Sequence, residues 1–127
     1  MTASAVVRKR FTTQEYEQIA AAGVFAEDDR VELLEGEIVE MSPIGPSHSA
    51  CIDRLNRLLQ RQVKDAAIVR VQSPVRLGQH SEPQPGVSLL QPRDDFYAGG
   101  PPEPEDVLLL IEVADSSLSY ARDLKLP

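Results

Sequence analysis

Apolar residues recur at helical spacing in two stretches of the chain. In the first, Thr12 and Glu15 have the three-residue spacing of a capping box, which predicts a helix beginning there. The second predicts a longer helix over about Ser47 to Lys64, with Pro46 suited to its first turn and Ser47 to its cap. The apolar stripe of this second helix consists of Ile52, Leu55, Leu59 and Val63.

Three other apolar stretches are typical of strands. Residues 30–41 alternate around Gly36, which predicts a hairpin with this glycine in the turn. Residues 67–77 predict an extended strand in which Pro74 indicates an edge or a bulge. Residues 107–111 are uniformly apolar and predict a strand buried on both faces. Together these elements predict an α/β fold with a central mixed β-sheet flanked by helices.

Length and composition predict one domain over residues 1–127, with residues 1–10 disordered. No apolar stretch is long enough to span a membrane, and no secretory signal begins the chain, so we expect a cytoplasmic protein. Cys51 lies in a helical apolar pattern and is interpreted as a core residue. The net charge of −7 argues against non-specific nucleic-acid binding by the domain as a whole, but it permits a local basic face.

Glu112 follows the apolar run 107–111 directly. An ionised carboxylate at the end of a buried strand is costly unless it is paired, hydrogen-bonded or bound to a metal. Glu112 therefore either marks the place where the strand leaves the core or belongs to a functional site. The residues alone leave both interpretations open.

The strand ending in Glu112-Val113, the serine-rich turn after it and Lys125 beyond that turn carry a resemblance. This pattern resembles the Uma-type restriction endonuclease family of the PD-(D/E)XK nuclease superfamily. The resemblance implies a restriction-endonuclease-like core and hydrolysis of DNA phosphodiesters with Mg²⁺ or Mn²⁺. In most members of the superfamily the lysine stands two residues after the glutamate, where this chain has Ala114.

The resemblance also implies roles for individual residues. Glu112 and the residue at position 86 would hold the metal, assisted by the backbone carbonyl of Val113. Lys125 would orient or activate water, and Glu32 would lie near the active site. His48 and Glu82 are candidates for a supporting position around these groups.

Two positions depart from the family pattern. An aspartate is expected at position 86, where this chain has Gly86, and an acid is expected near Ala121. Glycine supplies no metal ligand, so the resemblance predicts weak or absent activity. Glu82 stands four residues upstream and beyond two prolines, which argues against its replacing the missing aspartate. The alternative is a catalytically dead module that binds DNA or protein.

One basic face is predicted on the second helix, opposite its apolar stripe. It is either an ordinary solvated face or a surface for DNA phosphates. We also expect that the family fold continues beyond Pro127 and that an exposed sheet edge favours a homodimer. The residues of the basic face are Arg54, Arg57, Arg61 and Lys64.

Overall fold

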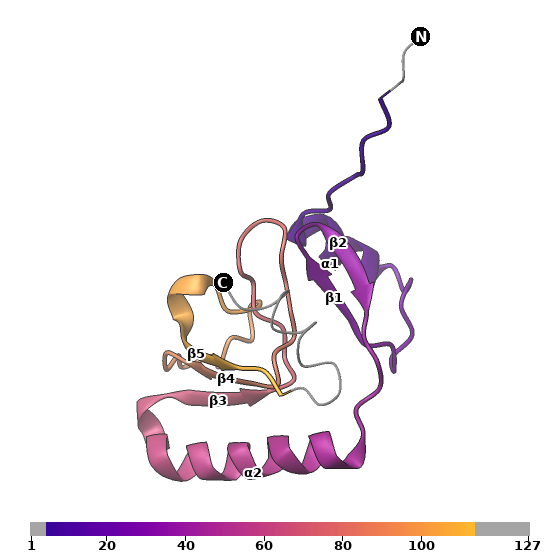
Figure 1. Ribbon diagram of the computed structural model, residues 1–127. Helices are drawn as coiled ribbons and strands as arrows, with labels where there is room; N and C mark the ends of the chain where they lie inside the picture. The colour runs from indigo at the N-terminus through magenta and orange to yellow at the C-terminus, as the bar shows by residue number, and fades with distance from the viewer. Residues whose placement is uncertain (1–4, 114–127) are drawn as a thin grey trace.

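The computed structural model describes residues 5–113 and contains two α-helices in that part of the chain (Figure 1). Helix α1 is Thr13–Ala21 and helix α2 is Pro46–Val63. Two short 3₁₀ helices, η1 (Lys64–Ala66) and η2 (Pro104–Asp106), precede strands. Neither α-helix has the length and hydrophobicity that crossing a membrane requires.

The five strands of the described residues form two sheets. Strands β1 (Val31–Leu34) and β2 (Glu37–Glu40) pair as a hairpin. Strands β3 (Ile68–Val71), β4 (Val87–Leu90) and β5 (Val107–Ile111) form a second sheet in the order β3-β4-β5. The predicted α/β fold is confirmed, but each pair is antiparallel where a mixed sheet was expected. The two-residue turn between β1 and β2 allows only antiparallel pairing, and no helix long enough for a parallel crossover stands between β3, β4 and β5.

Local sequence signals set the N-terminal part of the fold. The Thr12 side chain accepts a hydrogen bond from the Glu15 amide at 3.1 Å, and the Glu15 carboxylate accepts one from the Thr12 amide at 2.9 Å. The predicted capping box is therefore present. In the hairpin turn, Glu35 and Gly36 both have positive φ, at 53° and 84°. The Phe11 amide donates to the carbonyl of Gly36, which ties the N-terminal segment to this turn.

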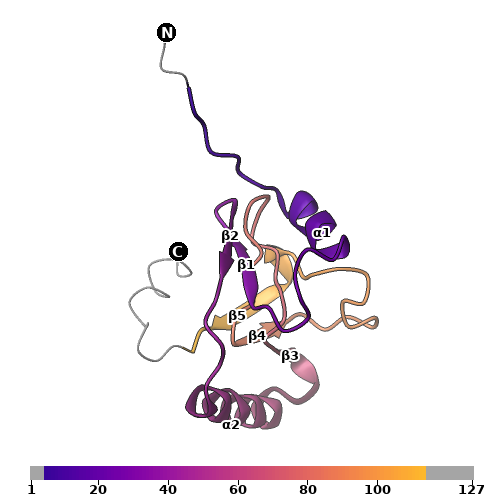
Figure 2. The same ribbon diagram turned by 90° about the vertical axis from the view of Figure 1, so that its right-hand side faces the viewer.

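Helix α2 packs along one face of the β3-β4-β5 sheet, and the β1-β2 hairpin stands on the other side of that sheet (Figures 1 and 2). Ile52 is the buried residue of the apolar stripe, and the remaining stripe residues are half-buried. The predicted helix begins one residue earlier than expected, at Pro46. Gly45 is its N-cap and Ser47 is not, because proline occupies the first turn with its preset φ.

The strand predicted over residues 67–77 is wrong in its length, because β3 ends at Val71. Gln72 has a φ of 52°, which turns the chain out of the sheet before Pro74. Val75 and Leu77 then donate backbone hydrogen bonds to Pro83 and Ser81, so residues 73–85 form an irregular ribbon. This ribbon also bonds to β1, between Leu33 and Glu82, and connects the two sheets.

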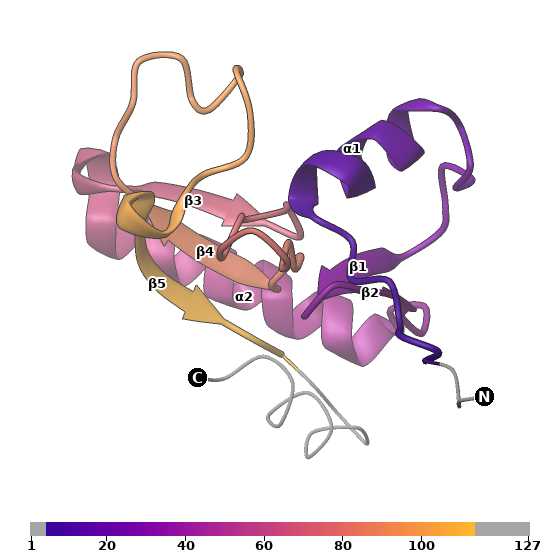
Figure 3. The same cartoon turned by 90° about the horizontal axis from the view of Figure 1, so that it is seen from above.

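The core of the larger sheet lies on the face away from α2. Val75, Leu90 and Tyr97 are buried together there. Residues 91–106 form a loop that returns over this core (Figure 3), and the Tyr97 hydroxyl donates to the carbonyl of Gln91 at 2.6 Å. Tyr97 anchors this loop to the core, whereas the Phe96 side chain is 67% exposed.

Candidate functional site

The sheet register brings position 86 and Glu112 to neighbouring strands. Val87 pairs with Ile111, and continuing this antiparallel register by one place sets Gly86 opposite Glu112. The Gln72 amide donates to the Gly86 carbonyl at 3.1 Å, which makes 72 and 86 a hydrogen-bonded pair. Hydrogen-bonded and non-hydrogen-bonded pairs alternate along an antiparallel ladder. In a central strand, a residue that forms a hydrogen-bonded pair with one neighbouring strand forms a non-hydrogen-bonded pair with the other. Gly86 and Glu112 therefore form a non-hydrogen-bonded pair, the class in which facing side chains are closest.

Gly86 leaves little room for a side chain. A Cβ atom there would lie 3.3 Å from the Ile111 carbonyl oxygen and 3.5 Å from the Val113 amide nitrogen. These two backbone groups flank Glu112 on either side, so any side chain at position 86 would begin directly beside that residue. Gly86 does not have the positive φ that only glycine adopts readily, so another L-residue fits its backbone conformation.

Glu32 lies close to the same end of the sheet. It belongs to β1 and is 2% exposed. Its carboxylate accepts a hydrogen bond from the Gln84 amide, which lies between Pro83 and Pro85. Because Gln84 is two residues from Gly86, this bond fixes Glu32 next to the entry into β4. Three of the predicted site positions, 32, 86 and 112, thus come from separate elements to one region.

Glu82 lies in a different setting, a charged cluster around Arg76. The Arg76 guanidinium contacts Glu17 of α1 at 2.5 Å and Glu103 at 2.7 Å, while Glu82 is 3.8 Å from its Nε. Burial, with a hydrogen bond to Glu17 and the charges of Glu17 and Glu103, raises the pKa of Glu82 to about 8, although Arg76 opposes this. Burial also raises the pKa of Glu17. The hydrogen bonds of Glu17 to Glu82 and Arg76 outweigh burial, so that the pKa of Glu17 is lowered overall.

His48 and the basic face belong to helix α2 and to the residue that follows it. His48 is half-buried in the first turn of α2, and Arg54, Arg57 and Arg61 are exposed on the side of α2 that turns away from the sheet. Lys64 is exposed in η1 and lines a cavity beside β3. Gly86 shares its sheet face with Ser88 and Leu90, the face opposite α2, since side chains alternate along a strand. The sheet therefore separates the basic face from Glu112. Lys125 and Ala121 lie outside the described residues.

The residues present do not make a complete set of ligands for a divalent cation. Within 5–113, no three acidic, histidine or cysteine side chains come together in a way that could hold a metal. Glu112 and Glu32 provide carboxylates, but the Glu32 carboxylate already accepts the Gln84 amide and Gly86 provides none. Magnesium requires several oxygen ligands in near-octahedral geometry. The described residues therefore do not by themselves provide this set.

Sequence reasoning missed two arginines, Arg76 and Arg70, because each lies in an apparently ordinary strand segment. Arg76 is the centre of the charged cluster just described, and nothing in the spacing of Glu17, Glu82 and Glu103 indicates that they meet. Arg70 stands on β3 with a buried Nη1 atom. A basic residue within an otherwise apolar strand was the available signal for Arg70.

The comparisons with known proteins concern the family of the chain. Residues 13–127 match the family model Uma2, whose description is Putative restriction endonuclease. No curated protein matched the chain. The match spans almost the whole sequence and includes positions 32, 86 and 112 together with Lys125. The chain therefore belongs to the Uma2 family.

Proposed function

We propose that this member of the nuclease family hydrolyses phosphodiesters only weakly or not at all. The observation that carries the proposal is the pairing of Gly86 with Glu112. The family suggests the use of a divalent metal, and a carboxylate at position 86 would stand where it could share an ion with Glu112. Glycine removes that oxygen donor while leaving the backbone around it in place.

The experiment is Mn²⁺ binding by calorimetry, followed by plasmid nicking. Manganese takes the same oxygen ligands as magnesium and binds such sites more tightly. We expect no measurable binding by the unmodified chain and one site in Gly86→Asp, with nicking gained by the same variant. The new side chain needs the Ile111 carbonyl to move by a few tenths of an ångström.

The matched control is Gly86→Ala, which adds the same Cβ atom without a carboxylate. It should neither bind Mn²⁺ nor nick DNA, so that any change specific to Gly86→Asp belongs to the carboxylate. Binding of Mn²⁺ by the unmodified chain would refute the proposal. Absence of binding in Gly86→Asp would show that position 86 is not the missing ligand.

A catalytically inactive module that binds DNA is the second candidate. It is favoured by the four exposed cations of the basic face, none of which has an ion-pair partner within the part of the chain that the structure describes. Such cations are available to phosphates of a DNA backbone. Their position across the sheet from Glu112 supports a binding surface that is separate from the family's catalytic position.

We also propose that the chain forms a homodimer through strand β5. Among the strands of residues 5–113, β5 pairs with β4 alone. Leu108 and Leu109 are 49% and 45% exposed, so β5 is not buried on both faces as its apolar run predicted. Exposed leucines on an edge strand favour association with a second copy, because pairing would cover apolar surface and satisfy backbone groups.

A further inference from the structure

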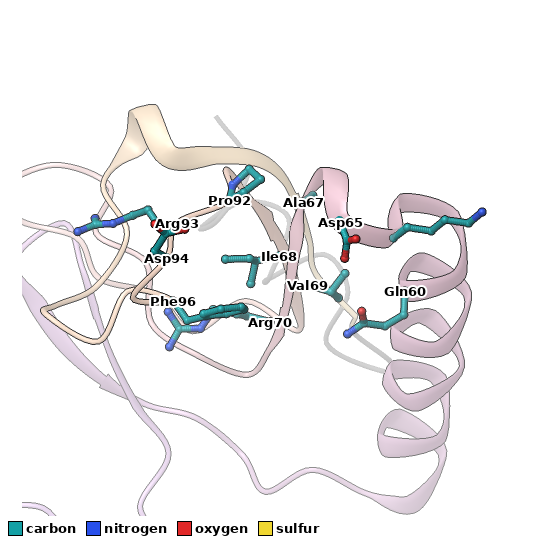
Figure 4. A pocket seen from close by; sticks show the side chains of 11 residues that line it. Gln60, Asp65, Ala67, Ile68, Val69, Arg70, Pro92, Arg93, Asp94 and Phe96 are labelled. Carbon is teal, nitrogen blue, oxygen red and sulfur yellow. The ribbon is translucent and has the colours of Figure 1, made fainter.

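A cavity of about 560 Å³ lies along the outer edge of β3, at the opposite end of the sheet from Gly86 (Figure 4). It is bounded by Gln60 at the end of α2, by residues 67–70 and by residues 92–96. Ile68 and Val69 both line it, although successive strand side chains point to opposite faces. The cavity therefore follows the edge of the strand and reaches both of its faces.

The backbone of β3 offers hydrogen-bonding groups to this cavity. Strand β3 stands at the end of its sheet and pairs with β4 alone among the described strands. Residues 72 and 86 form a hydrogen-bonded pair, so by alternation the N–H and C=O groups of Arg70 and Ile68 bond to β4. Those of Val69 and Val71 point outward, toward the open edge. An open edge of this kind is a template for a further strand.

Arg70 adds a positive charge to the lining of the cavity. In Figure 4 the side chains of Arg70 and Phe96 lie together at one side of the cavity, and Ile68 points into its middle. The Nη1 atom of Arg70 is covered and has no hydrogen-bond partner in residues 5–113, so a partner would meet the part of the guanidinium that lines the cavity. A carboxylate is the group that binds a guanidinium best.

We propose that the β3 edge binds an extended peptide segment of a partner protein, with one acidic residue opposite Arg70. The segment adds a strand to the sheet, its backbone bonding to Val69 and Val71. Its acidic side chain lies on the same face as Arg70, as cross-strand neighbours do. An apolar residue two places away meets Ile68. Among the other charged residues of the lining, the charges of Lys64 and Arg93 balance those of Asp65 and Asp94, which leaves Arg70 as the excess charge and favours a single acid opposite it.

This inference is independent of position 86 and extends beyond the proposed function. The probe is a synthetic peptide, acetyl-Lys-Thr-Ile-Thr-Glu-Thr-Ile-Thr-Lys-amide, which presents the same side chains in either strand direction. Binding is followed by ¹H–¹⁵N chemical shifts and by amide hydrogen exchange of the full chain. We expect slower exchange of the Val69 and Val71 amides on peptide addition. The Arg70 amide, which already bonds to β4, should change little.

Peptide variants test the acidic residue without altering the protein. Replacing the glutamate of the probe by glutamine should weaken binding about tenfold, the effect of losing one charge-assisted hydrogen bond. Replacing the flanking threonines by proline should abolish binding, because proline has no N–H for the strand edge. Equal binding of the glutamate and glutamine peptides, or binding of the proline peptide, would overturn the proposal.

Exchanging the charges of Arg70 and of the peptide glutamate tests their contact directly. Arg70→Glu should lose the glutamate peptide and bind a version carrying lysine at the same place, whereas Arg57→Gln on α2 should bind as the unmodified chain does. Failure of the glutamate peptide to bind the unmodified chain at millimolar concentration would also refute the proposal. Because the peptide series uses the unmodified chain, the proposal stays testable even if Arg70→Glu does not fold.

Discussion

Two single residues have clear chemical consequences in this protein. Gly86 has no side chain beside the backbone that flanks Glu112, and Glu82 is a buried carboxyl group beside Arg76. Under the proposed function, Gly86 withholds a carboxylate from a metal bound by Glu112. Glu82 places a group with a raised pKa at the junction of α1, β1 and the ribbon of residues 73–85. The contact of Glu82 should therefore depend on pH.

The pKa of Glu82 predicts how the free energy of unfolding changes with pH. Since the folded-state pKa of about 8 lies above its ordinary value, the folded protein holds a proton that the unfolded chain releases. The stabilisation is fully present below the unfolded pKa and is lost as pH rises through about 8. We expect the free energy of unfolding to fall by on the order of 2 kcal/mol between about pH 5 and about pH 9.

Urea denaturation across this pH range checks the expectation. The groups facing Glu82 are Tyr16 and Glu17 of α1, Arg76 of the ribbon and Glu103 before η2. Glu82→Gln mimics the protonated carboxyl and should flatten the dependence of unfolding free energy on pH, whereas Glu37→Gln, at an exposed glutamate of β2, should leave the slope of this dependence unchanged. A slope unchanged by Glu82→Gln would assign the pH dependence to other groups.

Helix α2 has one apolar and one basic face. Its apolar stripe packs on the sheet, while Arg54, Arg57 and Arg61 are exposed on the other side and Lys64 follows in η1. Both faces follow from a period of 3.6 residues, so both were predictable from the sequence. The position of these two faces relative to Glu112 was not predictable, because it depends on which face of the sheet the helix covers.

DNA affinity should depend on these cations of α2. The triple variant Arg54→Gln, Arg57→Gln, Arg61→Gln should weaken binding to a duplex and reduce the slope of log affinity against log salt by about one for each contact removed. Fluorescence anisotropy over a salt series measures this slope. Arg8→Gln, an exposed arginine of the N-terminal segment, is the control and should leave the slope unchanged. An unchanged slope in the triple variant would refute the DNA-binding interpretation of α2.

Across the whole molecule, the β1-β2 hairpin and helix α2 lie on opposite sides of the three-stranded sheet (Figure 2). This arrangement sets three separate surfaces: the end with Gly86 and Glu112, the outer side of α2, and the β3 edge. The exposed leucines of β5 form a fourth. Because these surfaces do not overlap, substitutions at one can be tested without disturbing the next.

Self-association is the prediction for the molecule as a whole. We expect sedimentation velocity to show a dimer at micromolar concentration, and Leu108→Lys to shift it to monomer, because a charge on this strand disfavours edge pairing. Val24→Lys, at a valine that is 66% exposed after α1, is the control and should not change the sedimentation coefficient. A clean monomer for the unmodified chain would contradict the prediction.

The sequence alone determined the local structure and the family. The capping box at Thr12, the hairpin turn at Gly36 and the stripe of α2 depend on neighbours within a few residues, and all three are present. Glu112 also follows β5 directly, as the apolar run predicted. These features rest on residue type and spacing, which can be read without a structure. The aspartate expected at position 86 rests on the family resemblance and stays a prediction.

Only the tertiary structure decided how distant segments meet. The register that sets Gly86 opposite Glu112, the contacts of Arg76 with Glu17 and Glu103, and the buried Nη1 of Arg70 all join residues far apart in the chain. The early end of β3 at Val71 is of the same kind, because the ribbon that follows bonds to a different sheet. Such contacts depend on long-range pairing and burial, and local propensity does not encode them.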